Sequence, residues 1–168
     1  MLKSYGISFT ILLSLALIET SILSNISILP VVPDLVLIAS IYISLLNGRG
    51  MGEICGFTSG LLLDFLSGAP FGFNCIFRTI IAYIAGFFGR TINYTGFVIP
   101  FVIGLLGTLS KALLIWITSL FYTSIQNYDV FSMKFLFELI FNALLTPVIF
   151  KLISCFKRSL NLYKEDLN

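Results

Sequence analysis

Five charged side chains stand inside stretches of the sequence that are otherwise apolar. Three are acids and two are bases: Glu19, Asp64, Arg78, Lys111 and Glu138. A charged group at the centre of a membrane helix costs about 2.5–3.5 kcal/mol on insertion scales, so such groups pair with one another or line a wet pocket. The chemistry open to this set is therefore ion pairing or the binding of a small polar ligand.

Residue types that most catalytic and metal sites need are missing. The chain has no histidine, which removes the commonest general base and every histidine-containing metal site. Cys55, Cys75 and Cys155 show no ligand spacing and are interpreted as small apolar helix residues. No Ser–Lys or Asp–Asp pair stands at a catalytic spacing. We therefore expect no enzyme activity, no cofactor and no metal.

Composition sets the environment of these charges. Of the 168 residues, 58% are hydrophobic and 11% are charged, whereas a soluble domain carries about a quarter charged residues. The polar residues are too few to cover a surface that faces water, so most of the chain must face lipid or other helices. The net charge of +2 comes with no basic block, so nucleic acid is not an expected partner. The sequence predicts an all-α integral membrane protein in a lipid bilayer.

Six stretches have the hydropathy and boundaries of membrane helices within a single transmembrane domain, residues 1–168. They are residues 7–28, 34–46, 53–66, 73–88, 97–122 and 135–156. The second and third are short for a full crossing, so we expect a hairpin shielded by its neighbours or by a thinned bilayer. The first is expected to be retained rather than cleaved as a signal peptide, because Glu19 interrupts it and no cleavage site follows.

The basic residues favour one orientation of a six-helix bundle. With the N-terminus in the cytoplasm, the basic positions on that side are Lys3, Arg49, Arg90, Lys151, Lys157, Arg158 and Lys164. The outer loops then hold Lys134, in keeping with the positive-inside rule. A five-span arrangement would place the basic C-terminal tail outside. We therefore predict six spans with both termini in the cytoplasm.

Glycine recurs every four residues around the third stretch. Gly52, Gly56 and Gly60 lead to Asp64, and the same step continues through two more glycines, Gly68 and Gly72. Stripes of small residues let a second helix approach to backbone contact in a membrane. The stripe predicts a packing or partner-binding groove that ends at a carboxylate.

Chain direction places the five intramembrane charges in the outer half of the bundle. Pairing is therefore expected between Asp64 and Arg78, and between Lys111 and either Glu138 or Glu19. Asp64 has alternative roles, because it stands near the membrane edge. It could cap the N-terminus of a helix that starts in the following turn, or be a hydrated interfacial acid.

The run from Pro33 to Asn74 resembles the signature region of the rod shape-determining protein MreD family. The matching pattern is a Pro-Asp that opens a hydrophobic helix, a turn containing glycine, and then GFTSGLLLDFLSGAPFG. The positions that carry it are Pro33, Asp34, Gly56, Phe57, Gly60, Asp64, Gly68 and Gly72.

This resemblance implies a non-enzymatic component of the bacterial cell-elongation machinery in the cytoplasmic (inner) membrane. Such a protein would bind MreC, a bitopic protein with one membrane span and a large external domain. Through MreC it would link MreB filaments to RodA and to a class B penicillin-binding transpeptidase. The resemblance also implies a bundle similar to the substrate-binding component of energy-coupling-factor transporters, although a shared fold does not confer function.

Two functions from different classes remain open. One is a membrane scaffold that binds partner helices through its glycine groove and its outer charge cluster. The other is the substrate-binding subunit of a vitamin-type transporter, with a pocket in the outer half of the bundle. Polar residues that could line such a pocket are Asn74, Arg78, Glu138 and Asn142. An intramembrane enzyme is a third class, which no residue constellation supports.

Overall fold

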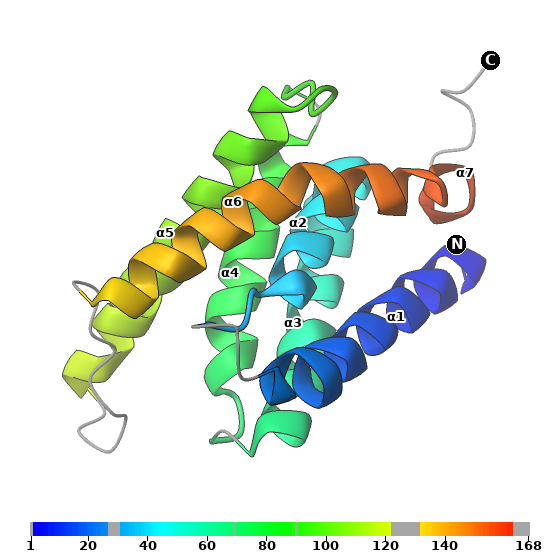
Figure 1. Cartoon of the computed structure of the whole chain (residues 1–168). Coiled ribbons are helices and arrows are strands. Elements are labelled where there is room, and N and C mark those ends of the chain that lie inside the picture. The colour runs from blue at the N-terminus through cyan, green and yellow to red at the C-terminus, as the bar shows by residue number, and fades with distance from the viewer. Residues whose placement is uncertain (1, 27–30, 69, 90, 122–131, 163–168) are drawn as a thin grey trace.

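The computed structural model describes residues 2–26, 31–68, 70–89, 91–121 and 132–162, and every regular element in them is a helix (Figure 1). The elements are α1 (Leu2–Leu17), which continues through a π-helical turn (Ile18–Ile22) and a 3₁₀ turn (Leu23–Asn25), then α2 (Leu35–Asn47), α3 (Arg49–Ser67), α4 (Phe73–Phe88), α5 (Val98–Phe121), α6 (Met133–Ser154) and α7 (Lys157–Leu160). Arg90 and Lys164, two of the basic residues used to predict the orientation, lie outside the described residues.

Each of the six predicted stretches contains a helix, and the bounds of the fourth are those of α4, whereas the others have shifted ends. The largest differences are in the first and third, which begin at Leu2 and Arg49 rather than at residues 7 and 53. Within the described residues, three helical segments are long and apolar enough to cross a membrane: Lys3–Asn25, Val98–Thr118 and Met133–Ser154. α2 and α4 are shorter apolar helices. The chain is thus a helical membrane protein.

α2 is the central helix of the bundle. Its sequence, LVLIASIYISLLN, is apolar on nearly all sides, which is typical of a helix buried in a protein core or spanning a membrane. Every residue of α2 except Leu46 is buried, and α1, α3, α4, α5 and α6 all pack against it. At about 1.5 Å per residue its 13 residues reach only about 20 Å, short of the roughly 30 Å of a bilayer core. Of the two explanations for this short stretch, the structure shows shielding by neighbouring helices.

Two antiparallel pairs surround α2. α3 packs most extensively against α4, and these two helices lie beside α2. α6 packs along α5 and crosses α2 at an oblique angle (Figure 1). α7 packs against α1, and the backbone N–H of Leu162 donates to Asn47 Oδ1 at 2.8 Å. The C-terminal segment therefore covers the end of α2 where Asn47 lies.

Candidate functional site: a buried charge network

Asp34 is the centre of a buried ion-pair network. It is the N-cap of α2, where its Oδ1 accepts a hydrogen bond from the backbone N–H of Leu37 at 2.9 Å. Arg78 Nη2, from α4, donates to Asp34 Oδ1 and Oδ2 at 2.7 and 2.8 Å. Lys111 Nζ, from α5, donates to Oδ2 at 2.8 Å. The side chains of Asp34 and Arg78 are each only 2% exposed, so one carboxylate joins three helices inside the bundle.

The network continues onto α6. Lys111 Nζ also donates to Glu138 Oε1 of α6 at 2.8 Å. Asn142, one turn further along α6, accepts from the backbone N–H of Asp34 at 2.8 Å and donates to Thr108 Oγ1 at 3.1 Å. These bonds fix the start of α2 against α5 and α6.

Glu19 joins the network from the end of the first helical segment. Its Oε2 accepts from the backbone N–H of Val36 at 3.2 Å, in the first turn of α2. The first N–H groups of a helix have no partner within the helix and carry partial positive charge, so a carboxylate there is favourable. Glu19 lies within the π-helical turn Ile18–Ile22, and π-turns of this kind are frequent at functional sites.

The structure confirms one predicted ion pair and corrects the other. Lys111 pairs with Glu138, as expected. The predicted pairing of Asp64 with Arg78 is wrong, because Arg78 pairs with Asp34. In the sequence pattern Asp34 opens a hydrophobic helix and is not among the five charges expected to cluster. The sequence does contain a signal for it, since the predicted topology runs the second stretch inward and so places Asp34 at the same end of the bundle as the other charges.

Arg78 uses only part of its hydrogen-bonding capacity. Its Nε and Nη1 atoms are buried and have no hydrogen-bond partner among the residues that the structure describes. The guanidinium carbon lies 5.7 Å from the centroid of the Phe77 ring, within the range of a cation–π contact. A buried donor without a partner costs about 1–3 kcal/mol, so this side chain is held mainly by its ion pair with Asp34.

Asp64 caps α4 instead of joining the network. Its side chain is 2% exposed and accepts from the backbone N–H of Gly72 at 2.9 Å, the backbone N–H of Asn74 at 3.0 Å and the Asn74 side-chain amide at 2.7 Å. The N–H groups at a helix N-terminus need such acceptors. Of the roles open for Asp64, capping a helix that starts in the following turn is the one observed. Asn74 is bound to Asp64, whereas Asn142 binds Asp34 and Thr108, so the polar set considered for a ligand pocket is divided between two clusters.

Asp64→Ala is expected to lower the free energy of unfolding by about 1–3 kcal/mol, because three donors at the start of α4 lose a buried acceptor. Asp64→Asn retains one carbonyl oxygen as an acceptor, so its free energy of unfolding should fall less than that of Asp64→Ala. Thermal unfolding of the purified variants in mild detergent measures both effects. Wild-type stability in the alanine variant would show that this cap contributes nothing.

Three glycines of α3 form the seam against α4. They are Gly52, Gly56 and Gly60. A Cβ added at Gly56 would lie 2.6 Å from the backbone oxygen of Arg78, and one at Gly60 would lie 2.5 Å from the Cα of Cys75. Contacts that short with a backbone cannot form without moving a helix. The groove predicted from the glycine spacing is therefore filled by α4 of the same chain.

Gly68 and Gly72 do not belong to this groove. α3 ends at Ser67, and both glycines have positive φ, 68° and 88°, in the connection to α4. An added Cβ at either would have no atom within 4 Å, although the backbone conformation itself disfavours a side chain. The four-residue spacing continues through the sequence, but the helix that would align these glycines with Gly60 has already ended.

Comparison with known proteins identifies the family. The family model for rod shape-determining protein MreD matches residues 3–156, which include every residue of the charge network, the cap and the glycine seam. No match was found among curated proteins or among solved structures. Because the matched region spans most of the chain, this protein belongs to the MreD family of rod shape-determining proteins.

Proposed function

We propose that this protein is a non-enzymatic scaffold of the bacterial cell-elongation machinery in the inner membrane. Membership of the MreD family implies a role in rod-shape determination. In the proposed arrangement the chain crosses the membrane six times, with both termini in the cytoplasm and a bundle resembling the substrate-binding component of energy-coupling-factor transporters. It binds an MreC-type bitopic protein and through it links MreB filaments to RodA and a class B penicillin-binding protein.

The observation that supports a scaffold is that the buried charges pair with one another across the bundle. Lys111 pairs with both Asp34 and Glu138, which joins three helices. Buried ion pairs of this kind are poor evidence for stability but can fix the register of the elements they join. A bundle whose helices are fixed relative to one another presents constant outer faces to partner helices. This is what a scaffold requires.

One observation favours the second function, a substrate-binding subunit of a vitamin-type transporter. The two unused donors of Arg78 could bind a carboxylate or another anionic group of a small molecule. The same guanidinium is already paired with Asp34, however, and Asn74 is engaged elsewhere. We therefore place the scaffold first.

Co-purification tests the proposal. The tagged chain is expressed with the MreC-type protein of the same bacterium and purified in mild detergent, with an unrelated tagged six-span protein as the control. The two proteins are expected to elute together, and the chain is expected to restore rod shape to cells depleted of their own MreD-type protein. Recovery of an ATP-binding cassette module or a tightly held small molecule, without the MreC-type protein, would contradict the scaffold and favour the transporter.

A further inference from the structure

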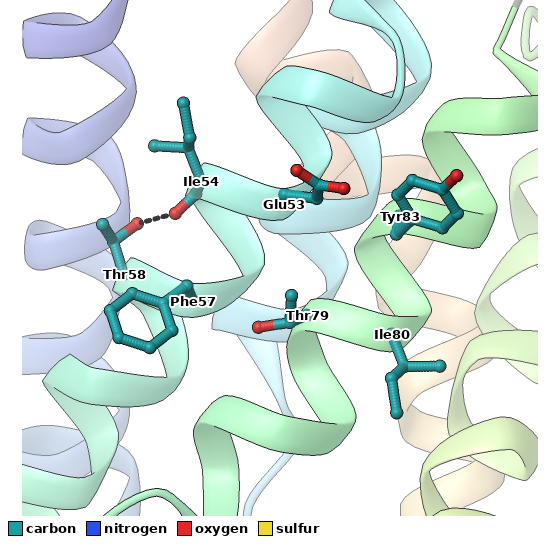
Figure 2. Close-up of a pocket in the computed structure, with 7 residues that line it drawn as sticks. All are labelled: Glu53, Ile54, Phe57, Thr58, Thr79, Ile80 and Tyr83. Atoms are coloured by element: carbon teal, nitrogen blue, oxygen red, sulfur yellow. Dashed lines mark hydrogen bonds between the residues drawn. The ribbon is translucent and has the colours of Figure 1, made fainter.

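The outer side of the α3–α4 pair carries an open groove of about 530 Å³ (Figure 2). Its lining residues are Glu53, Ile54, Phe57 and Thr58 of α3 and Thr79, Ile80 and Tyr83 of α4. The hydroxyls of Thr58 and Thr79 donate to carbonyls of their own helices, Ile54 O at 2.7 Å and Cys75 O at 2.6 Å. Both threonine hydroxyls are thus satisfied within the chain, and the groove offers a mainly apolar surface.

Glu53 is the acid of this groove. It is exposed and forms no ion pair within the part of the chain that the structure describes. It stands one turn after Arg49, at the end of α3 that the distribution of basic residues assigns to the cytoplasm. Figure 2 shows Glu53 and Tyr83 near one end of the groove, with Phe57 and Ile80 further along. The groove therefore has a carboxylate at its cytoplasmic end and an apolar surface beyond it.

This charge discriminates among possible occupants. A lipid acyl chain could fill an apolar groove, but the anionic headgroups of the cytoplasmic leaflet would be repelled by Glu53. A second copy is also disfavoured. Two copies with the same orientation in one membrane are related by an axis along the membrane normal, so an isologous contact through this groove places Glu53 opposite Glu53 at equal depth.

A transmembrane helix from a different protein has the complementary charge. Lys and Arg are concentrated where a single-span helix emerges into the cytoplasm, which is the depth that the proposed topology gives Glu53. The exposed side chains of Ile54 and Phe57, 45% and 51% accessible, can then pack against the apolar part of that helix. The glycine seam behind the groove holds α3 and α4 in backbone contact, so the groove exists before a partner binds.

We propose that the α3–α4 groove is the docking site for the single transmembrane helix of a bitopic partner, whose basic cytoplasmic flank pairs with Glu53. The inference rests on the proposed scaffold function and names the surface through which the scaffold acts. It assigns recognition to the exposed side of α3 next to the glycine stripe, where Glu53 and Phe57 each follow a stripe glycine by one residue.

Site-specific photocrosslinking in cells tests this surface. A benzophenone amino acid replaces Phe57 in the groove or, as the matched control, Leu113 of α5, which is similarly exposed at 57%. The probe partner is the MreC-type protein used in the co-purification. Crosslinks to its transmembrane segment are expected from position 57 and not from position 113. Crosslinks from position 113 alone, to a second copy of the chain, or to no protein while the partner still co-purifies would each overturn the docking site.

Reversing the charge of Glu53 provides a second test of the docking site. Glu53→Lys is expected to lower recovery of the partner at least about tenfold while membrane abundance and monodisperse elution stay unchanged, because Glu53 is exposed. Replacing a single basic residue of the partner's cytoplasmic flank with glutamate, and keeping the others that set its orientation, should restore recovery with Glu53→Lys. Undiminished recovery with the charge-reversed variant overturns the docking site and leaves the scaffold standing. Absence of the partner from the wild-type preparation instead refutes the scaffold, and the docking site with it.

Discussion

Asp34→Ala is expected to lower the free energy of unfolding by about 3–5 kcal/mol, which is typical when one member of a buried ion pair is removed. The substitution leaves Arg78, 2% exposed, without its carboxylate, removes one of the two acids on Lys111, and deletes the cap on the Leu37 N–H. Asp34→Asn keeps an oxygen for the cap but not the charge, so it should lower the free energy of unfolding less than Asp34→Ala does. Thermal unfolding in mild detergent and abundance in the membrane are the measurements.

Glu53→Ala is the matched control for this prediction, because Glu53 is an exposed acid outside the network. Its stability should stay within about 0.5 kcal/mol of wild type. A double-mutant cycle of Asp34→Ala with Arg78→Met adds a second check. Since the two side chains are in direct contact, the double variant should lose less than the sum of the single losses, with a coupling of about 0.5–3 kcal/mol. Additive losses, or an Asp34→Ala variant as stable as the control, would contradict a network centred on Asp34.

Gly60→Ala is the second substitution with a large expected effect. Its Cβ would lie 2.5 Å from both the Cα and the N of Cys75, so α3 and α4 must move apart. Overpacking of this kind costs about 1–3 kcal/mol, and Gly60→Leu should cost more. Gly50→Ala, in the same helix, adds a Cβ with nothing within 4 Å and should be neutral or stabilising by up to about 1 kcal/mol. The difference between these two variants in thermal unfolding isolates the packing seam.

Equal stability of Gly60→Ala and Gly50→Ala would show that α3 and α4 are packed less tightly than the contact distances at Gly60 indicate. The expected loss of stability also makes Gly60→Leu unsuitable as a test of partner binding. Loss of a partner in that variant would report disruption of the α3–α4 pair rather than removal of a contact surface. Substitutions at exposed Glu53 and Phe57 avoid this ambiguity, because neither side chain is enclosed by the bundle.

The helical membrane class, the helices and the close contact on α3 could all be predicted from the residues alone. Hydropathy is summed over many residues, so the helical stretches were clear even where their ends shifted by several positions. The short length of residues 34–46 predicted shielding by neighbouring helices or by a thinned bilayer, and α2 is buried throughout except at Leu46. The spacing of Gly56 and Gly60 predicted a backbone-to-backbone approach, because small residues repeated on one helix face have that consequence in a membrane.

Which charged groups pair with one another depends on how the helices pack, and the residues alone did not predict it. Chain direction gives the depth of a residue in a bundle but not the neighbour that it faces, so Asp34 and Asp64 were both available to Arg78. The choice depends on how α2 and α4 are rotated, which places Asp34 on Arg78. The partners of Asp64 are backbone N–H groups at the start of α4, and they are brought to it only when the α3–α4 hairpin closes. The same closure covers the glycine face of α3 and leaves the face bearing Glu53 and Phe57 outside.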